Sequence, residues 1–516
     1  MSSLHTLAGE IASRGVGYAF GVTGSGATLT LADALEKAGV EIVRTQFEGN
    51  AAIMAGTVGR LTGKAGVAFC IKGPGLANMV PGLAVSWFEH YPLIAICEAY
   101  PPGSSAAKAH KLINHAHLTQ AVTKGRRVLG VDAPGFAELC HSAEAEIPGP
   151  VVLELAGIED GGSPQPMASA AACGEHLQLL TLVRQARRPV IIAGTLAIRL
   201  GLPAALNRLC IPVFSTAAAK GVVNETLPHA AGVHTGVGLA LAPETQLLAE
   251  ADLVIGIGLR PNEVLATKPF PCPAVNVEPL AQLPGSEAFG FVAVSGSSQL
   301  PALLNELAGK AWGLDLVTDS LGRMHARLAD SPFLPAQAFA GIAAHFGSAV
   351  RMVMDTGYFC TIGEHVWRAP RPELCLLSGQ GRYMGTGLSM GIAAALTDSS
   401  VPTVVVVGDG GIGASVGELR IALERRLPLL VVLMTDGRFG SIRTRALKDR
   451  LSESSLTIGN PSWIPTLAGM GLPAWIAADR NALAAALAAW QPAEGPAYIE
   501  IPYPADPYEQ MVRNIR

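Results

Sequence analysis

The sequence predicts an α/β protein made of three doubly wound domains, each built on a parallel sheet. Short apolar runs rich in β-branched residues alternate with helical patterns along most of the chain. The 516 residues suffice for about three domains of ordinary size. A content of 49% hydrophobic and 15% charged residues, with 58 glycines, fits a compact protein whose strands are buried on both faces.

The first domain is predicted to span residues 1–160. Helical patterns cover residues 4–14, 29–37, 48–61 and 76–88. Strands are expected between them, at residues 18–21, 41–44, 65–71, 93–97 and 151–155. The stretch 157–173 is rich in Gly, Pro, Ser and Ala and breaks both periodicities, so we interpret it as a linker.

A central domain is predicted over residues 175–314, with strands at residues 189–193, 212–215, 253–256 and 274–277. Its Gly256-Ile257-Gly258 follows a strand but lacks a third glycine at the dinucleotide-binding spacing, so an ordinary tight turn is the favoured interpretation. The third domain is expected over residues 333–516 and repeats the size and rhythm of the first. Its predicted strands cover residues 350–354, 373–377, 403–407 and 429–434.

The stretch 404–440 in the third domain gives the strongest indication of a ligand-binding site. An apolar run leads into Gly408-Asp409-Gly410-Gly411, a helical pattern covers residues 415–425, and a second run stops at Thr435-Asp436-Gly437. Glycines at such a turn let the main chain approach a diphosphate. Two carboxylates at neighbouring strand ends would repel that diphosphate unless a hard cation such as Mg²⁺ lay between them. The alternative is an ordinary turn with solvated acids.

Composition and charge argue against several classes of function and location. A net charge of −4 gives no basic surface field, so nucleic acid is not an expected partner. The eight cysteines lack metal-binding spacing and are expected to be buried reduced thiols, which suits the cytoplasm. The N-terminus has the pattern of an amphipathic helix instead of a signal peptide, and no apolar run is long enough for a membrane span.

These motifs, with the stretch from Gln46 to Ala52 and the Gly-rich frame from Gly379 to Gly387, carry a resemblance over nearly the whole chain. The sequence resembles the thiamine diphosphate-dependent enzymes of the acetolactate synthase, pyruvate oxidase and benzoylformate decarboxylase type. Overall it looks most like acetolactate synthase large subunits. The resemblance implies that residues 1–160 form a domain that binds the pyrimidine of the cofactor and residues 333–516 one that binds its diphosphate. It also implies Mg²⁺ on Asp409, Asp436 and the carbonyl of Arg438. Asp436 stands where asparagine is commoner. The cofactor diphosphate is implied beside Gly408, Gly410 and Gly411.

Three further residues are implied to hold the cofactor. Glu48 is expected to hydrogen-bond its aminopyrimidine ring, where a carboxyl group can shuttle a proton. Glu48 could instead be a first-turn acid favoured by the helix dipole. Met384 stands where the family places an apolar wedge under the cofactor, although a methionine there could also be ordinary core. Thr361 is a candidate hydroxyl for the phosphate site.

The residues implied to face the substrate lie in the first domain. Ser25 occupies the place of a substrate-binding serine in benzoylformate decarboxylase, with a plain turn serine as the alternative. Ile71 replaces the active histidine of that subtype, which argues against a simple aromatic decarboxylase; Lys72 follows it. His110 and Lys111 fall at two pocket positions and would suit an anionic substrate. They could also belong to a solvated loop.

The resemblance implies an enzyme, a lyase or transferase, that decarboxylates, cleaves or ligates 2-oxo acids with thiamine diphosphate and Mg²⁺. The alternative is a lyase or decarboxylase of the 2-hydroxyacyl-CoA or oxalyl-CoA type. A non-catalytic cofactor-binding paralogue is disfavoured by the intact Glu48, Asp409 and Asp436. The family pattern also implies a homodimer or homotetramer with active sites between subunits.

Overall fold

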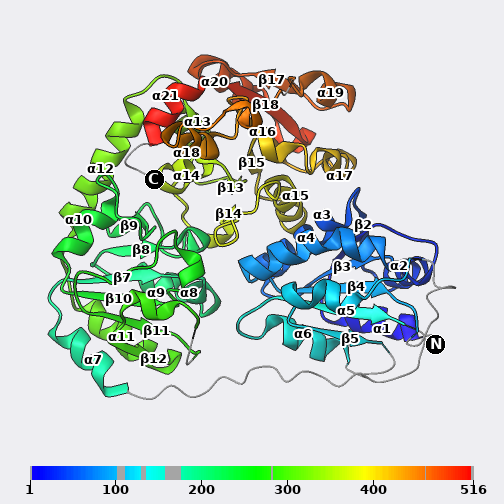
Figure 1. The fold of residues 1–516 in the computed structure, drawn as a ribbon, viewed down its shortest axis with the longest axis horizontal. Coiled ribbons are helices and arrows are strands. Elements are labelled where there is room, and N and C mark those ends of the chain that lie inside the picture. Colours follow the sequence, from blue (N-terminus) through cyan, green and yellow to red (C-terminus); the bar gives the residue numbers. More distant parts are fainter. Residues whose placement is uncertain are drawn as a thin grey trace.

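The computed structural model describes residues 3–101, 111–129, 135–156, 176–280, 283–459 and 461–512. Within them the chain forms three six-stranded parallel sheets flanked by helices. Figure 1 shows three lobes: the N-terminal lobe in blue and cyan, the central lobe in green and the C-terminal lobe in yellow to red. The predicted class of three doubly wound α/β domains is confirmed. The predicted linker, 157–173, lies outside the described residues.

The N-terminal sheet has the order β2-β1-β3-β4-β6-β5. Its strands are β1 (Tyr18–Gly21), β2 (Glu41–Arg44), β3 (Gly66–Cys70), β4 (Leu93–Glu98), β5 (Gly125–Val128) and β6 (Pro150–Leu155). The helices are α1 (Ser3–Ser13), α2 (Ala27–Lys37), α3 (Glu48–Thr62), α4 (Pro74–Glu89), α5 (His115–Thr119) and α6 (Phe136–Glu144). Strands β3, β4 and β6 are buried at every residue, as expected for a parallel sheet covered on both faces.

The central sheet has the order β12-β11-β10-β7-β8-β9. Its strands are β7 (Pro189–Ala193), β8 (Val213–Ser215), β9 (Ala230–Val233), β10 (Leu253–Ile257), β11 (Ala274–Val277) and β12 (Ala293–Ser295). The main helices are α7 (His176–Gln185), α8 (Thr195–Arg199), α10 (Pro243–Glu250), α11 (Leu300–Ala308) and α12 (Leu314–Ala329). A Cβ on Gly194 would lie 2.2 Å from the Gly258 carbonyl oxygen, so the Gly256–Gly258 turn is held by close packing against the neighbouring turn.

The C-terminal sheet has the order β14-β13-β15-β16-β18-β17. Its strands are β13 (Arg351–Met354), β14 (Cys375–Leu377), β15 (Thr403–Gly408), β16 (Leu429–Thr435), β17 (Ala474–Ile476) and β18 (Ala497–Pro502). The main helices are α13 (Pro335–Phe346), α14 (Tyr358–Val366), α15 (Gly387–Thr397), α17 (Leu419–Glu424), α18 (Gly440–Lys448), α20 (Arg480–Ala489) and α21 (Ala505–Val512). The predicted helix 415–425 is shorter than expected, because a 3-10 turn (Val416–Glu418) precedes α17.

The first and third sheets share one topology, in which the strands taken in chain order lie as 2-1-3-4-6-5. The direction of winding reverses between β1 and β3 in one sheet and between β13 and β15 in the other. Ligands of open α/β sheets bind outside the carboxyl ends of the strands at such a reversal. The candidate residues Ser25, Lys72 and Asp409 follow β1, β3 and β15, and so they lie at these two edges.

The N-terminal and C-terminal domains share one apolar core. Ala51 and Met54 of α3 belong to the same buried cluster as Leu388 and Ile392 of α15. The central domain shares a second apolar cluster with the C-terminal domain, in which its Val233 and Met324 lie with Phe339, and it contacts the N-terminal domain through ion pairs. The Arg260 guanidinium contacts Glu278 of its own domain at 2.9 Å and Glu146 of the N-terminal domain at 2.8 Å, and Arg199 contacts the same Glu146 at 2.7 Å.

The described part of the chain contains seven of the eight cysteines, and none of the seven forms a disulfide with another. Five are buried, but Cys210 is exposed and Cys272 half-buried, so the prediction of buried thiols is wrong for these two. Cys210 lies in an isolated β-bridge with Ala311, and Cys272 lies in the loop before β11. A search of the described helices finds none with the length and apolarity to cross a membrane.

Candidate active site

Glu48 begins α3 directly after the loop that follows β2. Its side chain is 7% exposed, and its Oε2 accepts a hydrogen bond from the Asn78 amide of α4 at 3.1 Å. A Cβ on Gly75 would lie 3.3 Å from Glu48 Oε1 and 2.7 Å from Ile71, so Glu48 lies beside the loop that follows β3. An acid that only stabilised the helix would face solvent, whereas Glu48 is directed into the domain.

The loop before Glu48 is held by a carboxylate from the C-terminal domain. Glu418 is buried and accepts hydrogen bonds from the Gln46 and Phe47 main-chain amides, at 2.9 and 3.2 Å, and from the Asn50 side-chain amide at 2.9 Å. These contacts span about 370 residues of sequence. The backbone that presents Glu48 is therefore fixed across a domain boundary.

Asp409 and Asp436 meet at the carboxyl edge of the C-terminal sheet. Asp409 Oδ1 accepts a hydrogen bond from the Thr435 hydroxyl at 2.7 Å, and Oδ2 accepts from the main-chain amides of Asp436 and Gly437, both at 3.0 Å. Asp436 Oδ1 in turn accepts from the Arg438 amide at 3.1 Å. Parallel pairing of β15 with β16 brings these two loops together, as their position at strand ends predicts.

The donor set at this edge suits a hard divalent cation. Burial raises the pKa of Asp436 to about 6, and the neighbouring charge of Asp409 adds to the rise; a bound cation would reverse that effect. In the chain as described, no three His, Cys, Asp or Glu side chains converge as a metal site by themselves. A cation here would therefore also need the Arg438 carbonyl, phosphate oxygens or water, which is how proteins hold Mg²⁺.

Met384 lies against the Gly-rich turn after β15. A Cβ placed on Gly410 would lie 2.7 Å from its sulfur and 2.6 Å from the Phe439 ring, so the Met384 side chain lies directly against this turn. Met384 is 48% exposed, which excludes the ordinary core role that was its alternative. Its main chain is fixed by Asp355, a buried carboxylate after β13 that accepts from the amides of Gly385 at 2.9 Å and Thr386 at 3.3 Å.

Asp355 also reaches the Gly-rich turn. A Cβ on Gly411 would lie 1.9 Å from its Oδ2, so this carboxylate joins the Met384 loop to the turn. Burial raises the pKa of Asp355 to about 6, against the lowering effect of its main-chain hydrogen bonds. Thr361 is buried in α14, and it is the ring of Phe359 from that helix that packs against Gly408.

Ser25 is exposed on the loop between β1 and α2. A Cβ on Gly24 would lie 2.1 Å from the Ile71 side chain, and one on Gly26 would lie 2.7 Å from Glu98 Oε1. The loop that carries Ser25 therefore packs tightly against the loop that follows β3 and against Glu98, the last residue of β4.

Lys72 contacts the same Glu98 carboxylate at 3.2 Å, and its ammonium lies 4.9 Å from the centre of the Tyr100 ring. Burial opposes ionisation of Glu98, but hydrogen bonds from Thr28 and the charge of Lys72 lower its pKa overall. The Lys72–Glu98 pair is thus an ionised pair at the edge where a substrate is expected.

Lys111 is exposed and lines, with Lys72 and Arg126, a cavity of about 210 Å³. Its main-chain oxygen would lie 2.1 Å from a Cβ on Gly73, so Lys111 lies over the loop that follows β3. His110 falls outside the described residues. The roles expected of Ser25, Lys111 and His110 stay predictions.

Sequence reasoning missed four buried carboxylates that organise this site, namely Glu89, Glu98, Asp355 and Glu418. Each accepts main-chain hydrogen bonds from a loop that carries a candidate residue. The only available signal was their position at the end of a strand or helix, which many solvated acids share. In three of the four cases, the main-chain segment that donates to the carboxylate is far from it in the sequence.

Three family models match the chain in the order of the three domains. The N-terminal binding domain of thiamine pyrophosphate (thiamine diphosphate) enzymes matches residues 1–120, the central domain matches residues 177–282, and the C-terminal binding domain matches residues 355–501. The first of these contains Glu48 and Lys72, and the third contains Met384, Asp409 and Asp436.

Similar curated proteins cover most of the chain at low identity. A probable 2-ketoarginine decarboxylase of Pseudomonas aeruginosa is 28% identical over 84% of this chain and 82% of its own length. The catabolic acetolactate synthase of Raoultella terrigena is 26% identical over 96% and 93%, and the acetolactate synthase of Bacillus subtilis is 24% identical over 95% and 91%. With the three domain matches, these likenesses show that the chain belongs to the thiamine diphosphate-dependent enzyme family.

Proposed function

We propose that this enzyme uses thiamine diphosphate and Mg²⁺ to decarboxylate, cleave or ligate a 2-oxo acid. One observation supports the proposal: the two domains with matching topology both place candidate residues at the carboxyl edges of their sheets, and each edge would supply half of a cofactor site. Glu48 belongs to the first half. Met384, Asp409 and Asp436 form the second, joined through Gly410 and the 435–438 loop.

The residues present have distinct tasks in this proposal. Asp409, Asp436 and the Arg438 carbonyl would hold the cation, and Gly408, Gly410 and Gly411 would let the main chain approach the diphosphate. Met384, with its main chain fixed and its side chain exposed, would support the cofactor between its two rings. Glu48 would exchange a proton with the aminopyrimidine ring. When bound, thiamine diphosphate supplies the chemistry that cleaves the bond next to a keto group.

The charges near the substrate edge favour an anionic substrate. Lys72, Lys111 and Arg126 line one cavity, against the acids Glu98 and Glu154. A carboxylate of a 2-oxo acid would be attracted to the excess positive charge. The relatives named as acetolactate synthases and as a 2-ketoarginine decarboxylase support the same substrate class.

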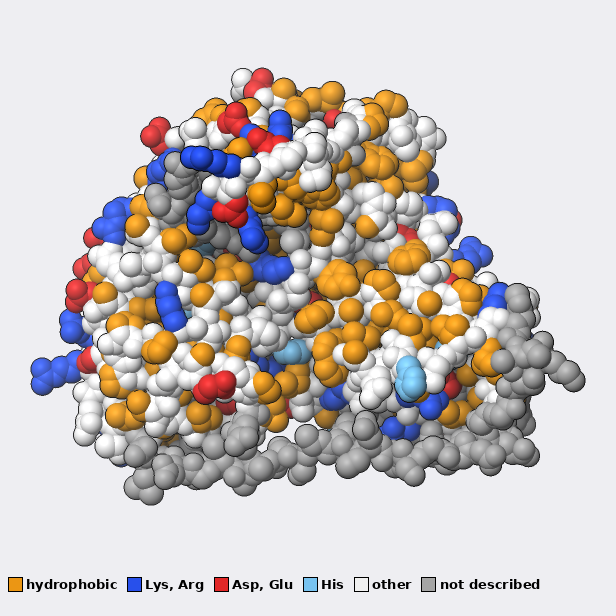
Figure 2. Space-filling view, in the orientation of Figure 1, with side chains coloured by type: hydrophobic (Ala, Val, Ile, Leu, Met, Phe, Trp, Pro, Cys, Tyr) orange, Lys and Arg blue, Asp and Glu red, His pale blue; other side chains and the backbone are white. Residues whose placement is uncertain are grey.

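We also propose that two copies of the chain complete the active site. The Glu48 side chain contacts Asn78 of its own domain, while the Met384 half faces outward on another domain. Figure 2 shows apolar side chains gathered on the N-terminal lobe and along its border with the C-terminal lobe. Large exposed apolar side chains such as Trp87, Phe88 and Met384 would be covered in a dimer.

The test adds thiamine diphosphate and Mg²⁺ to the purified protein and follows consumption of a panel of 2-oxo acids by mass spectrometry. Glu48→Gln removes the proton-exchanging group, so we expect turnover to fall by about 10²-fold or more. Glu36→Gln, at an exposed position of α2, is the matched control and should keep parental turnover. Full activity of Glu48→Gln would contradict the assigned role.

The metal site has its own test in cofactor binding. Asp409→Ala should weaken Mg²⁺-dependent binding of thiamine diphosphate by at least about tenfold in calorimetry, because it removes one of two carboxylates expected to hold the cation. Asp319→Ala, at an exposed position of α12, is the control. Unchanged affinity in the Asp409 variant would exclude the assigned metal position.

A further inference from the structure

Glu89 lies at the C-terminal end of α4, in the N-terminal domain, and is 4% exposed. All the donors that it has among the described residues belong to the C-terminal domain. It accepts from the Ser378 hydroxyl at 2.7 Å and from the main-chain amides of Gly379 at 3.0 Å, Gln380 at 3.2 Å and Gly381 at 2.8 Å. A carboxylate has only acceptor sites, so it can satisfy four such donors together.

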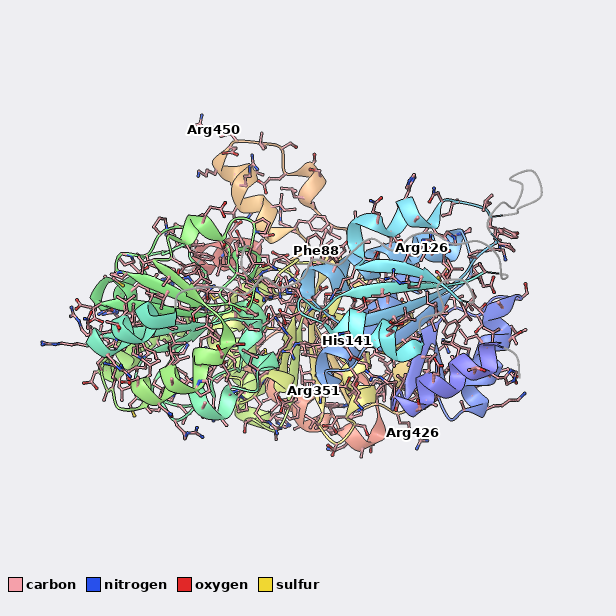
Figure 3. The ribbon with its side chains drawn as sticks, turned by 90° about the horizontal axis from the view of Figure 1, so that it is seen from below. Phe88, Arg126, His141, Arg351, Arg426 and Arg450 are labelled. Atoms are coloured by element: carbon pink, nitrogen blue, oxygen red, sulfur yellow. The ribbon has the colours of Figure 1, made fainter. Side chains whose placement is uncertain are left out.

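The loop that Glu89 holds is where the three domains meet. A Cβ on Gly379 would lie 2.6 Å from the Ala218 backbone of the central domain, and one on Gly381 would lie 2.8 Å from Phe88 of the N-terminal domain. Figure 3 places Phe88 near the middle of the molecule, at the edge of the N-terminal lobe that faces the other two. Both glycines therefore lie where a neighbouring domain leaves no room for a side chain.

A short chain of bonds connects this loop to Met384. The Ser378 hydroxyl donates to Glu89, which leaves its oxygen oriented to accept from the Tyr383 amide at 2.7 Å. Tyr383 precedes Met384. On the other side of Met384, Asp355 accepts from the Gly385 amide. Met384 is therefore held between two carboxylates, one from its own domain and one from the N-terminal domain.

We propose that Glu89 is a positioning residue that fixes where Met384 lies relative to the cofactor. It thereby makes cofactor binding depend on how the N-terminal domain is docked. This proposal rests on the proposed function, because it assigns Met384 to the cofactor. Glu89 touches neither cofactor nor substrate. Loss of its charge leaves four donors, three of them main-chain amides, without their common acceptor.

The first experiment needs no cofactor. In hydrogen exchange followed by mass spectrometry, Glu89→Gln should speed exchange in peptides covering residues 379–383 by about tenfold, because a side-chain amide offers one acceptor in place of two. Glu89→Asp, which keeps the charge, should restore part of the protection. The matched control is Glu263→Gln, a buried acid that accepts from Thr195 and Thr216 within the central domain. Parental exchange in Glu89→Gln would overturn the proposal.

The second experiment is a double-mutant cycle on the affinity for thiamine diphosphate, measured by calorimetry in the presence of Mg²⁺. We expect Glu89→Gln to weaken binding about tenfold in the parent and less than about twofold in a Met384→Ala background, since it acts through Met384. Equal weakening in both backgrounds would overturn the proposal. Because binding is read without turnover, a failure here differs from a failure to find a 2-oxo acid substrate.

Discussion

The buried carboxylates at this site accept hydrogen bonds from main-chain amides more often than they pair with cations. Asp355, Glu89 and Glu418 each accept two or more amide hydrogen bonds from a loop that carries a candidate residue. When one ionised carboxylate accepts hydrogen bonds from several amides, only one side chain loses entropy. The loop is then fixed although it has no regular strand pairing. Such acids determine where Glu48 and Met384 lie, although they touch nothing that reacts.

The sequence identified the residues of this site that stand in glycine-rich surroundings. Asp409 and Asp436 were recognisable because each ends an apolar run, and the structure brings them together. Glu89 and Glu418 were missed because their partners lie 289 to 372 residues away, and no local pattern marks an acid that is buried only when two domains dock.

The folding stability of the protein should decrease at acid pH because of His365, the histidine in the last turn of α14. It is 6% exposed and burial lowers its pKa to about 4, well below its usual value near 6.5. As the pH falls from 6.5 toward 4, the unfolded chain binds a proton that the folded chain excludes, so folding stability is lost. From pH 7 to 5 this residue alone should cost about 2 kcal/mol.

The measurement is urea unfolding of the parent and of His365→Gln at both pH values. The variant lacks the titrating group, so its free energy of unfolding should fall by about 2 kcal/mol less than that of the parent. His345→Gln, at an exposed position of α13, should behave as the parent does. An identical pH dependence in parent and His365→Gln would show that burial does not suppress this proton.

Among the secondary-structure elements, the contact between α3 and α4 supports the catalytic candidate most directly. A Cβ on Gly82 of α4 would lie 2.2 Å from the Gly49 carbonyl oxygen and 2.6 Å from the Ala52 side chain. Gly49 follows Glu48 at the start of α3. The helices can therefore approach this closely only because residue 82 has no side chain.

Gly82→Ala should force these helices apart, lower the free energy of unfolding by about 2 kcal/mol and reduce turnover by displacing Glu48. Gly9→Ala in α1 is a matched control, because a Cβ there meets nothing within 4 Å and Gly9 is exposed. That control should be neutral or stabilise by about 0.5 kcal/mol, since alanine favours helix more than glycine does. Denaturant unfolding and turnover measured on both variants test the contrast.

Strands were predictable from the sequence where complete burial made almost all of their residues apolar. Strands β3, β4, β7, β15 and β16 were expected from their apolar runs and are found with small shifts of their ends. The edge strands β5 and β17 were missed for different reasons: Arg126 and Arg127 interrupt the apolar pattern of β5, and β17 has only three residues. Strand β18 was missed because it carries Glu500, which is buried and bonded to Tyr498 at 2.9 Å.

At the scale of the whole molecule, the repeated strand order of the first and third sheets confirms the likeness expected from their rhythm. Their shared core, with α3 against α15, makes the two domains a single packed unit. The central domain is joined to the N-terminal domain by the ion pairs of Glu146 with Arg199 and Arg260. We therefore expect the first and third domains to unfold together.

The proposed sharing of the site between subunits can be tested by complementation. Co-expressed Glu48→Gln and Asp409→Ala chains, differently tagged and purified as mixed dimers, each lack one half of the site. If Glu48 of one chain serves the metal half of its partner, each mixed dimer holds one intact site, and an unsorted mixture should recover about a quarter of parental activity. Either variant alone is the control. Inactive mixed dimers would show that Glu48 and Asp409 of one site come from the same chain.

The contact of Glu89 with Ser378 also bears on the biosynthesis of the chain. The two residues are 289 positions apart. At ribosomal elongation rates, about 30 s pass between their appearance in a growing chain. During that interval the carboxylate lacks its later partners, and burying it alone would be costly. The nascent N-terminal domain should therefore keep the end of α4 open to water, where a chaperone can reach it, until the last domain emerges.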